Sequence, residues 1–218
     1  MIDPNTFLGD LLSSPTAKGA LGGVAGGALA GILVNKKARK ALGKTAVQAG
    51  GIAAIAGVAY YAYRKLNAPQ ATAAAPTDEA LVPPPADTPF LPPASDVAGR
   101  HDLGMKLIRA MIAAAKADGT MDAGELKTVI DTVEASELAA DDKSEILRAL
   151  NETIDVDTVA AMATCPEVAA EIYGASLTAI DLDTPAEQVY LSMLASKLGL
   201  SREMVVALHE AAETPAPL

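Results

Sequence analysis

Residues 45–63 form a run of 19 residues without a charged side chain, "TAVQAGGIAAIAGVAYYAY". As a helix this run would be about 28 Å long, close to the roughly 30 Å hydrocarbon core of a bilayer. Tyrosines followed by basic residues at the end of an apolar helix are typical of a membrane interface. The residues expected at that interface are Lys44, Tyr60, Tyr61, Tyr63, Arg64 and Lys65. We therefore expect a membrane helix here; the alternative is an alanine-rich helix in a protein core.

A second apolar run, residues 17–34, has glycine at every fourth position: Gly19, Gly23, Gly27 and Gly31. Residues four apart share one face of a helix, and small residues let helices in a membrane approach closely. This spacing predicts a packing face for residues 45–63, where Gly50 has the matching spacing, or for a second copy of the chain. The alternative is a flexible glycine- and alanine-rich segment.

Five basic residues lie between the two runs, in "NKKARKALGK". Such a segment is expected to stay on the cytoplasmic side of a bacterial inner membrane. Whether one run or both runs cross the membrane stays open, and so does the side on which the C-terminal part lies. The acidic start of the chain argues against a cleavable signal peptide.

Residues 67–96 contain eight Pro and eight Ala. Proline in this density prevents a regular helix or sheet, so we expect a disordered, extended tether. It divides the chain into a membrane-anchoring segment, 1–66, the linker, 67–96, and a C-terminal domain, 97–214.

The C-terminal domain has the apolar periodicity of helices throughout. The positions that repeat at helical spacing are Leu107, Ile108, Met111, Ile112 and Ala115; Leu126, Val129, Ile130 and Val133; Ile146, Leu147 and Leu150; and Val168, Ile172, Ser176 and Ile180. We expect an all-α bundle of six to seven helices around one core. Residues 97–218 have nine basic and twenty-one acidic residues, which disfavours nucleic-acid binding.

Two turns of this domain have similar acidic sequences. "AKADGTMDAGE" contains Asp118, Asp122 and Glu125, and "TAIDLDTPAE" contains Asp181, Asp183 and Glu187. In the second turn, Thr184 and Glu187 have the spacing of a capping box, Pro185 suits the first turn of a helix, and Gly199 suits its exit. Ser201 is expected to cap the last helix.

The turn "ADGTMDAGE", the stretch "VYLSMLASKLGLS" and the closing "ALHE" resemble the TerB-like tellurite-resistance domain. With "GGALAGILVNKKARKALGK" and "GGIAAIAGVAYYAYRK", the chain resembles the YebE-like bacterial inner-membrane family of unknown function (domain of unknown function 533). The resemblance implies an all-helical domain whose acidic turns hold a metal ion. The matching positions are Asp118, Asp122, Glu125 and Glu187, and carboxylates suit Ca²⁺ or Mg²⁺. The alternative is that these acids cap helices.

No pattern of a nucleophile with its base, of zinc ligands or of a phosphate loop is present in the sequence. Cys165 before Pro166 is expected to cap or pack, and His209 with Glu213 reads as an ordinary helix pair or a metal ligand. The sequence predicts a non-enzymatic scaffold or sensor in an envelope or metal-stress response. Its expected partners are membrane lipid, an unknown protein and a second copy through the glycine face. The alternative is a membrane-oligomerising or membrane-remodelling protein.

Overall fold

The computed structural model describes residues 51–67, 84–85, 87–117, 119, 121, 123–135, 138–180, 182 and 184–213. Its helices are α4 (Gly51–Asn67), α5 (Val97–Ala115), α6 (Ala123–Ala135), α7 (Ala140–Asn151), α8 (Val156–Ala161), α9 (Pro166–Ala179), α10 (Pro185–Lys197) and α11 (Arg202–Glu213). Over these residues the chain contains no β-strand. The predicted all-α fold class is therefore confirmed. The glycines of the predicted packing face (Gly19, Gly23, Gly27, Gly31, Gly50) and Lys44 lie outside these residues.

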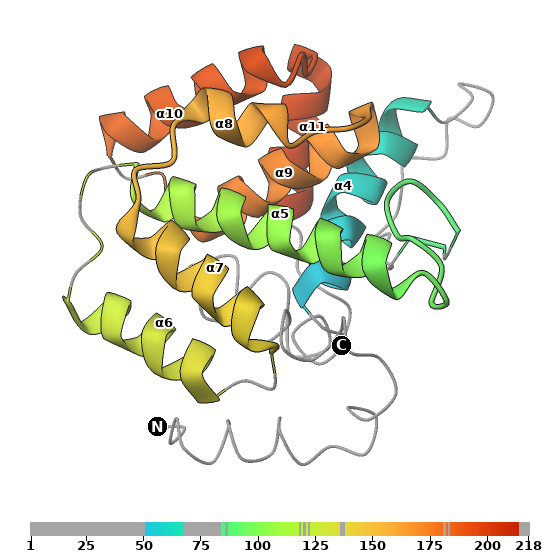
Figure 1. Cartoon of the computed structure of the whole chain (residues 1–218). Coiled ribbons are helices and arrows are strands. Elements are labelled where there is room, and N and C mark those ends of the chain that lie inside the picture. Colours follow the sequence, from blue (N-terminus) through green and yellow to red (C-terminus); the bar gives the residue numbers. More distant parts are fainter. Residues whose placement is uncertain are drawn as a thin grey trace, which may run out of the picture.

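Helix α9 lies at the centre of the bundle (Figure 1), where it contacts α4, α5, α10 and α11. Its residues from Val168 to Thr178 are all buried, because the helix is apolar around its whole circumference. Helix α5 crosses it closely, and the Ser176 hydroxyl of α9 donates to the Ala110 carbonyl of α5 at 3.5 Å. Helix α6 lies at the edge of the bundle and packs on α7.

The expected helix boundaries around α10 are confirmed by local hydrogen bonds. The Thr184 hydroxyl accepts from the Glu187 amide at 3.2 Å, while the Glu187 carboxylate accepts from the Thr184 amide at 3.0 Å. Gly199 leaves the helix with φ of 67°, which glycine adopts without strain. Ser201 Oγ accepts from the Met204 amide at 3.1 Å and so caps α11.

Helix α4 packs into the same bundle against α9 and α11 (Figure 1), although more than 95 residues separate it from either helix. Its buried core residues are Ile55, Ala56, Val58, Ala59 and Ala62. This helix covers most of the apolar run that the sequence analysis assigned to the membrane. Among the helices described, none is both long and apolar enough to cross a bilayer.

The tyrosines expected at a membrane interface contact protein in the structure. Tyr60 and Tyr63 pack edge-on against Phe90, with ring centroids 5.6 Å and 5.3 Å apart. Tyr61 is partly buried, and Arg64 and Lys65 are exposed at the C-terminal end of α4. The Arg64 guanidinium lies over the Tyr60 ring, 5.8 Å from its centroid.

Part of the range predicted as a tether also packs on the bundle. Phe90 is only 3% exposed, and a turn between Thr88 and Leu91 holds it in place through a 3.0 Å backbone hydrogen bond. Arg100 of α5 donates to the carbonyls of Pro92 and Pro93. The aromatic ring accounts for this order, because burying it between two tyrosines offsets the entropy lost by the turn.

Candidate functional site

The most unusual group in the described residues is the carboxyl of Glu171, in the middle of α9. Its side chain is 0% exposed, and neither of its oxygens has a hydrogen-bond partner in this part of the chain. The helix begins at Pro166 with Cys165 as its N-cap, and its one other charged residue, Glu167, lies in its first turn. A buried carboxyl without a partner is costly, so it calls for a functional explanation.

Glu171 lies on the face of α9 that meets α4. A Cβ placed on Gly174 would lie 3.8 Å from Val58 Cγ1, so Gly174 faces α4. Residues three apart lie on the same side of a helix, so Glu171 is one turn away on that face. Helix α4 has no charged residue before Arg64, so it places no cation beside the Glu171 carboxyl.

Burial raises the pKa of Glu171 to about 9, and the nearby Glu167 carboxylate acts in the same direction. The carboxyl is therefore protonated and neutral at pH 7. Two tyrosines of the same core are affected similarly: burial raises the pKa of Tyr173 and of Tyr190 to about 12. The core thus contains polar groups that are kept in their neutral forms.

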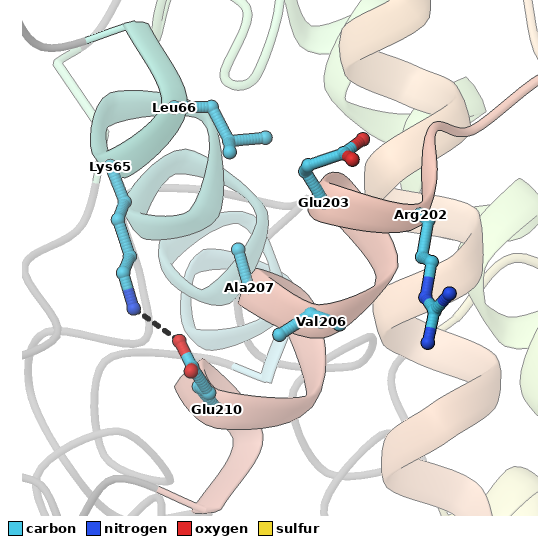
Figure 2. A pocket seen from close by; sticks show the side chains of 7 residues that line it. All are labelled: Lys65, Leu66, Arg202, Glu203, Val206, Ala207 and Glu210. Carbon is cyan, nitrogen blue, oxygen red and sulfur yellow. Dashed lines mark hydrogen bonds and ion pairs between the residues drawn. The ribbon is translucent and has the colours of Figure 1, made fainter.

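A second feature of the α4 interface is a shallow groove at its open edge, between the end of α4 and the first half of α11 (Figure 2). Its volume is about 310 Å³, and it is lined by Lys65, Leu66, Arg202, Glu203, Val206, Ala207 and Glu210. Leu66 and Val206 are 39% and 50% exposed. Lys65 and Glu210 form an ion pair across one end of the groove.

The groove has an apolar floor and charged ends, which is the composition of a surface that holds the apolar face of a peptide. Leu66 extends from α4 toward α11, and Val206 lies between the charged side chains in Figure 2. Val206 and Leu66 are exposed apolar side chains of two different helices, so the groove exists only when α4 is packed on α11.

Of the predicted metal-binding residues, the structure describes the side chain of Glu187 alone. Asp118 and Asp122 lie outside the described residues, as do the side chain of Glu125 and the neighbouring Asp181 and Asp183. Glu187 is 8% exposed, and its Oε2 accepts from both the amide and the hydroxyl of Thr184, each at 3.0 Å. Where side chains are described, no group of three His, Cys, Asp or Glu could hold a metal ion.

Two further residues from the sequence analysis have clear positions. Cys165 is the N-cap residue of α9, as its place before Pro166 suggested. His209 of α11 contacts Tyr173 of α9, with 3.0 Å between Nε2 and the tyrosine hydroxyl. This contact joins two helices that the sequence analysis treated separately.

Glu171 was not predicted from the sequence, although the sequence contains one signal of its burial. The stretch "VAAEIYGASLTA" has this single charge in an otherwise apolar helix. A helix that is apolar on every side is buried, so a charged residue in its middle must be buried as well.

Chemically, the carboxyl of Glu171 can hold and release a proton, while the groove between α4 and α11 can hold an apolar side chain.

The chain is similar to a known protein family. No curated protein and no solved structure matches the chain. The family described as protein of unknown function (DUF533) matches residues 19–212, which include all the helices described above except the last residue of α11. A match over this much of the chain includes both the apolar N-terminal runs and the helical bundle. The chain therefore belongs to the DUF533 family of proteins of unknown function.

Proposed function

We propose that this protein is a non-enzymatic scaffold or sensor, held at the bacterial inner membrane by its glycine-rich N-terminal part, and that its helical domain binds a partner protein. The observation that carries this proposal is the groove between α4 and α11, with Leu66 and Val206 exposed on its floor. Exposed apolar side chains in a groove with charged ends favour the binding of a helix or peptide.

The anchor in this proposal is residues 17–34. Helix α4 packs on α9 and α11, so we place the anchor in the apolar run before it. The basic segment 35–44 then lies between the anchor and the bundle, where it suits anionic headgroups. The TerB-like and YebE-like resemblance supports a role in envelope or tellurite-type metal stress.

The anchor is tested by cell fractionation of the full chain. We expect the protein in the membrane pellet after an alkaline wash. The double variant Leu21→Glu and Leu29→Glu should move it to the supernatant, because a charge within a bilayer costs about 2.5–3.5 kcal/mol. Ala71→Glu, in the linker, is the matched control and should stay in the pellet. Wild-type protein recovered as a soluble monomer would rule out the anchor.

The groove is tested in living cells with a photo-crosslinking amino acid at Val206. The control position is Met193 of α10, which is 47% exposed and does not line the groove. We expect a discrete adduct from position 206 that is absent from position 193 and is lost when Leu66→Glu is added. Identical adducts from both positions would mean that the groove is not the binding surface.

A divalent cation at the acidic turns remains a prediction from the sequence. It rests on the resemblance and on Asp118, Asp122 and Glu125, while Glu187 already bonds to Thr184.

A further inference from the structure

Helix α4 differs from the other helices around α9 in how it is attached. It contacts α9 and α11, and 29 residues separate its end at Asn67 from the start of α5 at Val97. Within the described residues, α4 is held by its own packing surface against α9 and α11 and by the contacts of Tyr60 and Tyr63 with Phe90. That surface is made of apolar side chains, and its Val58 lies beside Gly174, which is one helical turn from the buried Glu171.

Within the part of the chain that the structure describes, the carboxyl of Glu171 has no partner that would compensate its charge. Charged or titratable side chains on the helices around α9 have other contacts. Those with known partners are Lys65 with Glu210, Lys106 with Asp102, Arg109 with Glu145, His101 with Asp142, Lys197 with Asp157, Glu187 with Thr184, and His209 with Tyr173. Arg100 donates to the Pro92 carbonyl, Lys116 donates to the Leu150 carbonyl, and Arg64 lies over Tyr60. The charged group that acts on Glu171 electrostatically is Glu167, which has the same sign.

Of the remaining charged residues of α11, Arg202 and Glu203 line the open groove at the end of α4, and the side chain of Glu213 lies outside the described residues. Tyr190 of α10 is neutral at physiological pH, and burial raises its pKa further, to about 12. The interface between α4 and α9 is therefore compatible with a protonated carboxyl and has no described group that would stabilise a carboxylate.

We propose that the docking of α4 on α9 is linked to a proton: α4 covers Glu171 while this carboxyl is protonated, and α4 separates when the proton passes to water. The step is a simple dissociation, in which the O–H bond breaks, water takes the proton and the carboxylate becomes solvated. Separation also removes the groove, because Leu66 of α4 then leaves α11. The inference does not rest on the proposed function, since it concerns an interface within one chain.

The size of the effect follows from linkage. Glu171 has a pKa of about 9 under α4, and an exposed glutamate titrates near 4.5. Between these values the docked form binds one more proton than the separated form. Each rise of one pH unit therefore favours separation by up to tenfold. Docking is fully favoured below about pH 4.5, weakens as the pH rises, and reaches its minimum above about pH 9.

Hydrogen–deuterium exchange of the full chain, followed by mass spectrometry, tests this proposal between pH 6 and 9. At each pH, the exchange rate of residues 55–62 in the wild type is divided by the rate in Glu171→Gln, which cancels the intrinsic effect of pH. We expect the ratio to rise steeply, by up to tenfold per pH unit. Residues 146–150 of α7 should show a much smaller rise, because α7 packs mainly on α5 and α6.

Two further variants make the result decisive. Glu167→Gln keeps the buried carboxyl and should keep most of the pH response. Glu171→Met removes the charge and the polar atoms at similar volume, and it replaces Glu171→Gln if that variant does not fold. A flat ratio for residues 55–62 would overturn the proposal. An equal rise in α4 and α7 would overturn it too, because the carboxyl would then destabilise the whole fold.

Discussion

The hydroxyl of Tyr173 on α9 lies 3.0 Å from Nε2 of His209 on α11, at the point where the central helix meets the last one. Tyr173 is only 2% exposed, so its hydroxyl is removed from water and needs this partner. The two rings are tilted by 52° with centroids 6.0 Å apart, which adds packing to the hydrogen bond. The contact connects the bundle core to the helix that carries the groove.

Replacing Tyr173 by Phe removes this hydrogen bond and keeps the ring. We expect the free energy of unfolding to fall by about 1 kcal/mol, the usual net contribution of such a bond. Urea denaturation monitored by circular dichroism would measure the change. Tyr63→Phe is the control, because its ring contact with Phe90 persists. Equal stability of Tyr173→Phe and wild type would mean that the contact contributes nothing.

The buried carboxyl of Glu171 predicts a dependence of stability on pH. Since its pKa is raised to about 9 in the fold, stability is highest below the unfolded value near 4.5 and falls as the pH rises toward 9. Within this window, a rise of one pH unit lowers the free energy of unfolding by about 1.4 kcal/mol when a single group titrates. The free energy of unfolding of Glu171→Gln, relative to that of the wild type, should therefore rise by about 3–4 kcal/mol between pH 5 and pH 8. Parallel curves of urea midpoint against pH would contradict the raised pKa.

Gly174 offers a stabilising substitution at the contact between α9 and α4. An added Cβ would lie 3.8 Å from Val58 Cγ1, which is ordinary van der Waals contact. Alanine in a helix is favoured over glycine by about 1 kcal/mol, so Gly174→Ala should raise stability by about 0.5–1 kcal/mol. Thermal melting would measure it. A lowered midpoint would indicate that α4 approaches α9 more closely than this distance suggests.

The capping box of α10 distinguishes a structural role for Glu187 from metal binding. Thr184→Ala should cost about 1 kcal/mol, because it removes the side-chain oxygen that caps the helix. Glu187→Gln can still accept from the Thr184 amide and should cost much less. Both losses should be the same in EDTA and in millimolar Ca²⁺ or Mg²⁺. A wild-type melting temperature that rises with the cation, and does so less in Glu187→Gln, would instead identify Glu187 as a ligand.

The packing of Phe90 on α4 predicts that the C-terminal end of the proline-rich segment stabilises this helix. Its ring is 3% exposed between Tyr60 and Tyr63. Phe90→Ala should lower stability by about 3 kcal/mol, as for other buried phenylalanines, and should speed amide exchange in residues 55–62. Phe90→Leu, which keeps most of the volume, should cost less than about 1.5 kcal/mol. No change in α4 exchange in the alanine variant would show that the ring does not secure this helix.

Local rules predicted the helices of the C-terminal part well. Thr184, Pro185 and Glu187 placed the start of α10, and Gly199 and Ser201 placed the turn to α11, because caps depend on neighbours a few residues away. The apolar stripes likewise predicted buried residues such as Met111, Val133, Ile146 and Ile172. The candidate site was not predicted, because its residues come from α4, α9 and α11.

By itself, the amino-acid sequence determined the all-α class, the ends of several helices and an apolar segment at residues 45–63 that must avoid water. Only the tertiary structure decided what surrounds residues 51–67, because a bilayer and a protein core satisfy the same apolar side chains. It also decided that Glu171 is neutral. The protonation of a carboxyl depends on the solvent and charges that distant helices leave around it, and these are not encoded in its immediate neighbours.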